Sequence, residues 1–279
     1  MREKGKRLLV YPFSLWMILF TLVPLAMVIW FAFTDANGNF TLANMAAMED
    51  FAGSFSYSIW VGFLSTLVCL LLAYPVAYSI SRKSQRVQQT MIMIVVLPMW
   101  MNSLLRITAL KSLLESNSLI NRLLESIGLE KFEILGTTAA VVLGMVYDFL
   151  PFMILPLYSV MVKIHPSVIE AAEDLGSNGL QVLFRVILPL SVPGILSGIT
   201  MVFVPAVSTF VVANLLGNSG VTTPMMVGEI IEFLFKGSAP AYYNLGAALS
   251  LVLMVLILIC ITVMNLVDKE DDLSGGITI

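Results

Sequence analysis

The fold is decided by the stretch Glu170–Pro189, which reads EAAEDLGSNGLQVLFRVILP. Charged residues make up only 12% of the 279 residues, so a polar segment followed by an amphipathic one, between two apolar runs, is unusual in this chain. A connection without a role would not need such patterning. We therefore expect this stretch to be a surface on which another molecule acts.

The composition excludes an ordinary soluble domain. Hydrophobic residues account for 58% of the sequence and charged residues for 12%, whereas a soluble domain carries about 25% charged residues. The net charge of −3 says little about partners, because the two signs are distributed unequally among the connections between apolar runs. The chain is therefore predicted to be an all-α, polytopic membrane protein.

Six apolar runs are candidates for membrane spans, because a hydrocarbon core of about 30 Å needs about 20 residues of helix. The third run is the shortest. The first is too long for the apolar part of a signal peptide and lacks a small-residue cleavage pattern, so we expect an uncleaved span. The predicted spans are Leu9–Phe33, Tyr57–Ser81, Met91–Leu105, Leu135–Met161, Leu188–Ala213 and Leu245–Val267.

Lys and Arg are distributed asymmetrically between the two sides of these spans. Ten lie at the N-terminus, in the second and fourth connections and at the C-terminus, and five lie on the opposite side. Cytoplasmic connections are enriched in Lys and Arg. We therefore expect both termini and the stretch Glu170–Pro189 to be on the cytoplasmic side of the membrane.

We divide the sequence into three parts. Residues 1–56 hold the N-terminal tail, the first span and an outer connection; residues 57–267 hold five spans, with a polar loop at 166–189; and residues 268–279 form an acidic tail. Prolines interrupt most runs and leave carbonyl groups that neighbouring helices must help to satisfy, so we expect a bundle. These prolines are Pro24, Pro75, Pro98, Pro151, Pro156 and Pro205.

Two connections on the predicted outer side carry helical patterns. Apolar residues recur with helical spacing from Leu119 to Ile127, and a second amphipathic segment follows Pro224. Both are expected to be short helices on the outer surface. Glu229 and Glu232 would share a face of the second helix, and we favour a solvated face over a substrate-attracting pair.

Several chemistries have no motif in this chain. It contains no Gly-x-x-x-x-Gly-Lys-Ser/Thr phosphate loop and no Cys/His metal spacing, so any nucleotide energy must come from another chain. Cys69 and Cys260 lie within apolar runs and are expected to be packing residues. His165 precedes Pro166, and we expect it to mark a helix boundary rather than to carry a proton.

The polar loop predicts two short helices joined by a glycine turn. Pro166 suits the first position of a helix, and Gly176 suits the left-handed conformation that ends one. Ser177 is the expected N-cap of the second helix, which should stop at Pro189. The first helix is two-faced: its apolar stripe is Val168, Ile169, Ala172 and Leu175, and its polar face is Glu170, Glu173 and Asp174. The stripe of the second helix is Leu180, Leu183, Phe184 and Ile187.

The anchors of this loop resemble a known motif. Glu170–Ala172 is followed after three residues by Gly176, and after nine more by Val186–Pro189. This pattern resembles the EAA loop of type I ABC importer permeases, with valine where isoleucine is usual. In that family the loop inserts into a cleft of the cytoplasmic ATPase and passes its closing motion to the transmembrane helices. The resemblance implies ATPase-coupling roles for Glu170, Ala171, Ala172, Asp174 and Gly176.

The resemblance covers nearly the whole chain and narrows to the PotB-like permeases of spermidine/putrescine importers. It is carried by Asn102–Ile107, Leu150–Ser159 and Glu170–Pro189. That family works with an ABC ATPase dimer (PotA-like), a second permease in a heterodimer (PotC-like) and an extracytoplasmic polyamine-binding protein (PotD-like). The resemblance therefore implies that this chain holds no cofactor and that ATP is bound by the partner ATPase.

Two positions depart from the pattern of that family. Thr108 stands where an aromatic residue is expected, and Asn214 stands where relatives often carry an acid. The second departure removes a carboxylate near the expected outer mouth of the pathway. It therefore weakens the inference that the cargo is a polycation.

One acidic residue lies inside a predicted span. Asp148 falls about halfway along Leu135–Met161, where an ionised side chain costs about 2.5–3.5 kcal/mol on insertion scales. Either Asp148 contacts an ammonium group of the cargo, or it is hydrogen-bonded to a neighbouring helix or held protonated. No ionisable partner is evident in the sequence. The flanking aromatic residues could stack on a cation, although such residues more often pack. The residues predicted for the substrate pathway are Asp148, Tyr147, Phe152 and Asn214.

Other functions leave different signatures. A permease for sulfate, phosphate or iron would share the EAA loop, but an anion importer is expected to carry basic residues deep in its spans, and none is predicted there. An intramembrane enzyme would need a paired acid/base or nucleophile constellation at one depth. A secondary transporter would need no loop shaped for a motor and should show an inverted repeat.

Overall fold

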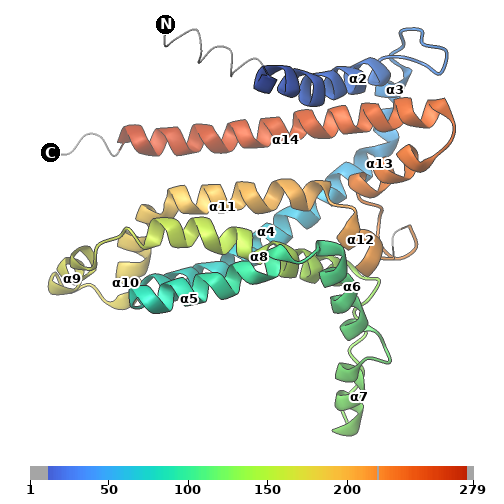
Figure 1. Cartoon of the computed structure of the whole chain (residues 1–279). Helices are drawn as coiled ribbons and strands as arrows, with labels where there is room; N and C mark the ends of the chain where they lie inside the picture. Colours follow the sequence, from blue (N-terminus) through green and yellow to red (C-terminus); the bar gives the residue numbers. More distant parts are fainter. Residues whose placement is uncertain (1–11, 219, 275–279) are drawn as a thin grey trace, which may run out of the picture. The chain divides into compact units, whose positions relative to one another are not determined.

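The structure confirms an all-helical, membrane-spanning chain. The computed structural model describes residues 12–218 and 220–274. Within them, the helices long and apolar enough to cross a membrane are Pro12–Ala32, Ala43–Ser81, Thr138–Met161, Gly179–Ser208 and Pro240–Met264, and a bent pair makes a sixth candidate (Figure 1). The predicted N-terminal basic tail lies outside the described residues.

The described elements are almost all helices, and an antiparallel bridge joins Thr34 to Phe40. The π-helices are η1 (Ile18–Leu22) and η4 (Leu183–Ile187), and the 3-10 helices are η2 (Ala47–Phe51) and η3 (Leu97–Trp100). The α-helices are α2 (Val23–Ala32), α3 (Ala43–Ala46), α4 (Ala52–Ser81), α5 (Gln85–Val96), α6 (Ser103–Leu114), α7 (Leu119–Ser126), α8 (Thr138–Met161), α9 (Pro166–Asp174), α10 (Gly179–Val182), α11 (Leu188–Ser208), α12 (Val211–Leu216), α13 (Val227–Lys236) and α14 (Pro240–Ser274).

The described residues form two compact units by their internal contacts, and the division into 1–56, 57–267 and 268–279 stays a prediction. The first unit is the described part of Met1–Gly53 together with Ile230–Ile257. Its core is built on small residues, Ala32, Ala247 and Ala248. The side-chain amide of Asn244 donates a hydrogen bond of 2.6 Å to the carbonyl oxygen of Thr34. Small side chains and a buried amide thus join the first and last spans.

The second unit holds Ser54–Glu229 and the described part of Leu258–Ile279. Here α8 packs along α11, and the buried side chains of α8 include Met145, Met153 and Leu157. Gly194 of α11 lies where a Cβ atom would come within 3.0 Å of the Pro156 carbonyl oxygen. A glycine at this position lets the two backbones approach closely, as small residues do between membrane helices. α8 is therefore the central helix of this unit.

The third span is broken, which corrects the prediction of a continuous run over Met91–Leu105. Gln85–Trp100 and Ser103–Ser126 are bent relative to one another by 93°. Pro98 lies in the 3-10 turn η3 that ends the first arm. Asn102 has an extended backbone, and its side chain accepts a hydrogen bond from the Leu104 N–H, so it caps a new helix, α6. The proline ends one arm and the asparagine starts the other.

Candidate functional site

The coupling loop, residues 162–187, connects α8 to α11 and contains α9, α10 and η4 (Figure 1). Pro166 is the first residue of α9, and His165 is its N-cap. The Nδ1 atom of His165 accepts a hydrogen bond of 3.3 Å from the Ser167 N–H. His165 therefore marks the helix boundary, as predicted.

A glycine turn ends α9, again as predicted. Gly176 has a φ of +84°, the left-handed conformation that glycine adopts without steric cost. Its N–H donates to the Glu173 carbonyl oxygen at 2.8 Å, and the Ser177 N–H donates to that of Ala172 at 3.0 Å. The turn thus satisfies carbonyl groups at the end of α9 and reverses the chain toward the second helix.

The second helix of the loop differs from the prediction at both ends. Asn178, not Ser177, is its N-cap, and Asn178 and Gln181 form a reciprocal capping box. The helix also does not stop at Pro189. It passes through the π-turn η4, in which the Leu188 N–H bonds to the Leu183 carbonyl oxygen, and continues into α11. Proline is tolerated there because Pro189 lies in the first turn of α11, where π geometry has already altered the hydrogen-bond register.

The loop rests on a small apolar cluster. Ile164, Val182 and Ile187 are buried, and Ile169 and Ala172 of α9 pack against them. The predicted apolar stripe of α9 is only partly used, because Val168 is exposed and Leu175 is 89% exposed. Ile169 and Ala172 therefore pack α9 against the rest of the loop, and Val168 and Leu175 face outward.

The outward surface of α9 combines carboxylates with apolar atoms. No residue of this helix is buried. Glu170, Ala171 and Asp174 are exposed, and the exposed Leu175 follows directly. A small residue between acidic ones leaves room for another backbone, and the carboxylates can accept charge-assisted hydrogen bonds. The surface is therefore suited to contact another protein.

Arg82 ties the end of α4 to the start of the coupling loop. Its guanidinium donates hydrogen bonds to the carbonyl oxygens of Ile164, at 3.0 Å, and Met161, at 3.1 Å. It also lies 5.3 Å from the centre of the Tyr78 ring. An arginine that binds the last carbonyls of a helix also offsets the negative end of the helix dipole. The sequence suggested only a cytoplasmic charge at this position.

Gln88 of α5 joins the same end of the bundle. Its side-chain NH₂ donates to the carbonyl oxygens of Ser81 and Lys83, and its side-chain oxygen accepts from the Tyr158 hydroxyl of α8 at 3.0 Å. α4, α5 and α8 are therefore connected by side chains next to the coupling loop.

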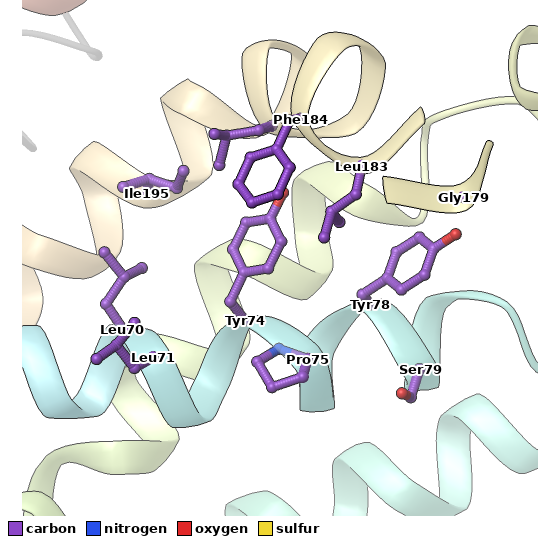
Figure 2. Close-up of a pocket in the computed structure, with 11 residues that line it drawn as sticks. Leu70, Leu71, Tyr74, Pro75, Tyr78, Ser79, Gly179, Leu183, Phe184 and Ile195 are labelled. Carbon is purple, nitrogen blue, oxygen red and sulfur yellow. The ribbon is translucent and has the colours of Figure 1, made fainter. Parts of the chain in front are cut away.

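A hollow of about 470 Å³ borders the loop, between α4 and η4. Figure 2 shows Tyr74 and Tyr78 of α4 facing Leu183 and Phe184 of η4. The lining is mainly apolar, and the Tyr74 hydroxyl lies 3.0 Å from that of Ser191 in α11. Tyr78 also packs against the apolar cluster under the loop. Tyr74 and Tyr78 therefore line the side of the hollow that faces η4.

The structure supplies the partner for Asp148 that the sequence did not reveal. Arg106 of α6 forms an ion pair with Asp148 at 2.5 Å, and both residues are 5% exposed. The Ser103 hydroxyl donates to the other carboxylate oxygen at 2.7 Å. Arg106 was expected in an outer connection, and the expectation that no basic residue lies deep in a span is wrong. The buried positive charge is compensated within the chain.

The other predicted pathway residues are scattered. Phe152 lies one turn from Asp148 in α8 and is partly buried, with its ring centre 6.4 Å from that of Phe149. Tyr147, also in α8, is exposed, and Asn214 is exposed on α12. Their roles along a substrate pathway stay predictions.

Glu229 is not on a solvated face, which corrects that expectation. It is 2% exposed, and its carboxylate accepts a hydrogen bond of 2.8 Å from the Met226 N–H at the start of α13. A carboxylate in the first turn of a helix satisfies free N–H groups and the positive end of the dipole. Glu232, by contrast, forms an ion pair with Lys236 at 2.6 Å.

Comparisons with known proteins agree with this architecture. Residues 1–270 match the family described as binding-protein-dependent transport system inner membrane component, so the chain belongs to this family of ABC importer permeases. It is 36% identical over 271 residues to the spermidine/putrescine transport system permease protein PotB of Haemophilus influenzae, covering 93% of this chain and 94% of that protein. It is 33% identical over 250 residues to PotB of Escherichia coli K12, covering 86% and 89%.

A solved structure supports the fold independently. The chain superposes with a TM-score of 0.80, at 20% identity, on a chain of a bacterial ABC transporter involved in the import of the acidic polysaccharide alginate, and covers 96% of each chain. This likeness establishes the type I importer permease fold.

Proposed function

We propose that this chain is one permease half of an ATP-driven polyamine importer, with spermidine or putrescine as cargo. The cargo assignment is carried by one observation, the 33–36% identity to PotB permeases over most of both chains. We place the coupling loop and both termini on the cytoplasmic side, because that side carries the excess of Lys and Arg.

The proposed mechanism uses the two ends of the coupling loop differently. The exposed surface of α9, with Glu170, Ala171 and Asp174, docks in the ATPase dimer, which binds ATP. Ala172 holds α9 on the chain, and Gly176 sets the turn into the second helix. Closing of the ATPase then moves α11 through η4 and moves α8 and α4 through Arg82. A second permease completes the pathway, and an extracytoplasmic binding protein delivers the cargo.

The test is reconstitution of this chain in vesicles with its ATPase, second permease and binding protein. We expect ATP-dependent uptake of spermidine or putrescine, and no uptake of sulfate, phosphate or iron. Glu170→Lys should abolish uptake by reversing the charge of the docking surface. Glu130→Lys, an equal charge reversal at an exposed residue after α7, should leave uptake unchanged. Uptake of an anion in place of polyamines would overturn the cargo assignment, and normal uptake by Glu170→Lys would overturn the docking assignment.

A further inference from the structure

The ion pair between Arg106 and Asp148 gives the intramembrane carboxylate a role different from binding cargo. We infer that Arg106 is the permanent counter-charge of Asp148, and that the pair fastens α6, the second arm of the bent span, to α8. Asp148 is then a positioning residue, and Arg106 is a further residue on which transport depends. The inference rests on the proposed function only for its transport measurement.

Each oxygen of the carboxylate lies against a polar group of α6. One faces the Arg106 guanidinium at 2.5 Å, and the other accepts the hydrogen bond from the Ser103 hydroxyl. Asp148 and Arg106 are each 5% exposed. A cargo ammonium group would have to displace Arg106 and open the contact between α6 and α8 before it reached the carboxylate.

The position of the pair explains what it fastens. α6 begins at Ser103, directly after the 93° break in the third span, and Arg106 lies in its first turn. The carboxylate thus also lies at the positive end of the α6 dipole. Because the contact is made where the chain has just changed direction, it determines where the whole arm points.

Arg106 depends on Asp148 as much as the reverse. Among the described residues, the guanidinium Nε and Nη1 atoms of Arg106 are buried without a hydrogen-bond partner. The Nη2 atom contacts Asp148, which is therefore the polar anchor of Arg106 on α8. Removing one member of a buried ion pair leaves an uncompensated charge in an apolar region, whereas removing both leaves none.

This asymmetry gives the experiment. Asp148→Asn, Arg106→Gln and the double variant are compared in the complete reconstituted importer, with spermidine as the probe. Each single change should lower the maximal uptake rate about tenfold or more without changing the half-saturating spermidine concentration, and the double variant should recover to within about threefold of the wild type. Arg122→Gln, which removes an exposed arginine of α7, is the control and should change neither value.

A cargo-independent measurement separates this inference from the proposed function. Each single change should lower the melting temperature of the purified complex, and the double variant should restore most of the loss. If the wild type fails to take up spermidine while this pattern holds, the proposed function fails and the inference stands.

The contrary pattern would overturn the inference. If Asp148 binds cargo, Asp148→Asn raises the half-saturating concentration at an unchanged melting temperature, and the double variant stays as defective as Asp148→Asn. Arg106→Lys and Asp148→Glu, which keep both charges, cover the case in which the neutral single variants do not fold. These two should retain more uptake than a single variant of either residue to alanine, and equal loss would also overturn the inference.

Discussion

The coupling loop and the Arg106–Asp148 pair are two concentrations of polar side chains in the second unit, and they differ in where their partners lie. α9 exposes Glu170, Ala171 and Asp174 and buries none of its residues. The ion pair exposes 5% of each member and finds its partner on a neighbouring helix of the same chain. A polar group in an apolar chain thus either faces another molecule or is compensated internally.

This difference has energetic consequences. An exposed docking surface contributes little to the stability of the isolated chain, so changes there should affect transport and not folding. A buried ion pair helps to fix one arrangement of the two helices that carry it. Removing one member leaves the other charge buried, with neither a partner nor solvent around it. The following predictions test that separation.

Of these three effects, the largest is expected at Gly176 of the coupling loop. A Cβ atom there meets no atom within 4 Å, so substitution acts through the backbone φ of +84° alone. The left-handed conformation costs an L-residue about 1–2 kcal/mol, so Gly176→Val should lower ATP-driven uptake about tenfold or more, while the melting temperature of the complex falls by only a few degrees.

Asparagine is the matched control, because it adopts the left-handed conformation more readily than other residues. Gly176→Asn should therefore keep most of the uptake. Equal loss with valine and asparagine would show that the turn conformation is not what the loop requires.

An intermediate effect is expected at Arg82, which joins the loop to the bundle interior. Arg82→Gln loses charged hydrogen bonds to two carbonyl groups. Such a hydrogen bond typically contributes about 1.5–3 kcal/mol, and because Arg82 is partly exposed, the contribution of each should lie at or below the lower end of this range. We expect ATP hydrolysis to continue while the ATP used per spermidine transported rises about fivefold.

Two variants sharpen this prediction. Arg82→Lys should be intermediate, since an ammonium group cannot reach both carbonyl oxygens with the geometry of a guanidinium. Lys83→Gln removes the neighbouring exposed charge and should leave the ratio unchanged. If Lys83→Gln raises the ratio as much, the effect is one of surface charge.

The smallest effect is expected for an uncharged pair at the same kind of interface. Tyr74→Phe removes the hydroxyl that lies 3.0 Å from Ser191. A neutral hydrogen bond contributes about 1 kcal/mol, so the melting temperature should fall by only about 2 °C. Tyr57→Phe, which loses a similar contact with Thr138, should behave alike. A loss as large as that of Asp148→Asn would show that charge is not what distinguishes the ion pair.

The two regions also differ in how far the sequence predicts them. The coupling loop is contiguous, so local rules predict its proline start, its glycine turn and its exposed acidic residues. Those rules fail for Ser177, because the neighbouring Asn178 is the N-cap instead. They also fail for Pro189, because a π-turn continues the helix past the proline. They also fail for Val168 and Leu175, because burial depends on what α9 packs against.

The ion pair depends on tertiary structure, which local sequence rules do not predict. Ser103 and Asp148 are separated by 45 positions, and they meet only because the third span breaks at Asn102. Without that break, Arg106 belongs to an outer connection, where its charge is unremarkable. The prediction that Glu229 lies on a solvated face is wrong for a related reason. Helical spacing assigns a residue to a face, but the Glu229 carboxylate turns inward to accept the hydrogen bond from the Met226 N–H at the start of α13.

The π-turn η4 has a mechanical consequence. Because the helix continues past Pro189, residues 179–208 are continuously helical, with Pro193 and Pro205 inside α11. The chain changes direction between α10 and α11 (Figure 1), and η4 joins the two parts through the hydrogen bond from the Leu188 N–H to the Leu183 carbonyl oxygen. A displacement of the coupling loop therefore reaches α11 through continuous helical backbone, without a flexible connection between them.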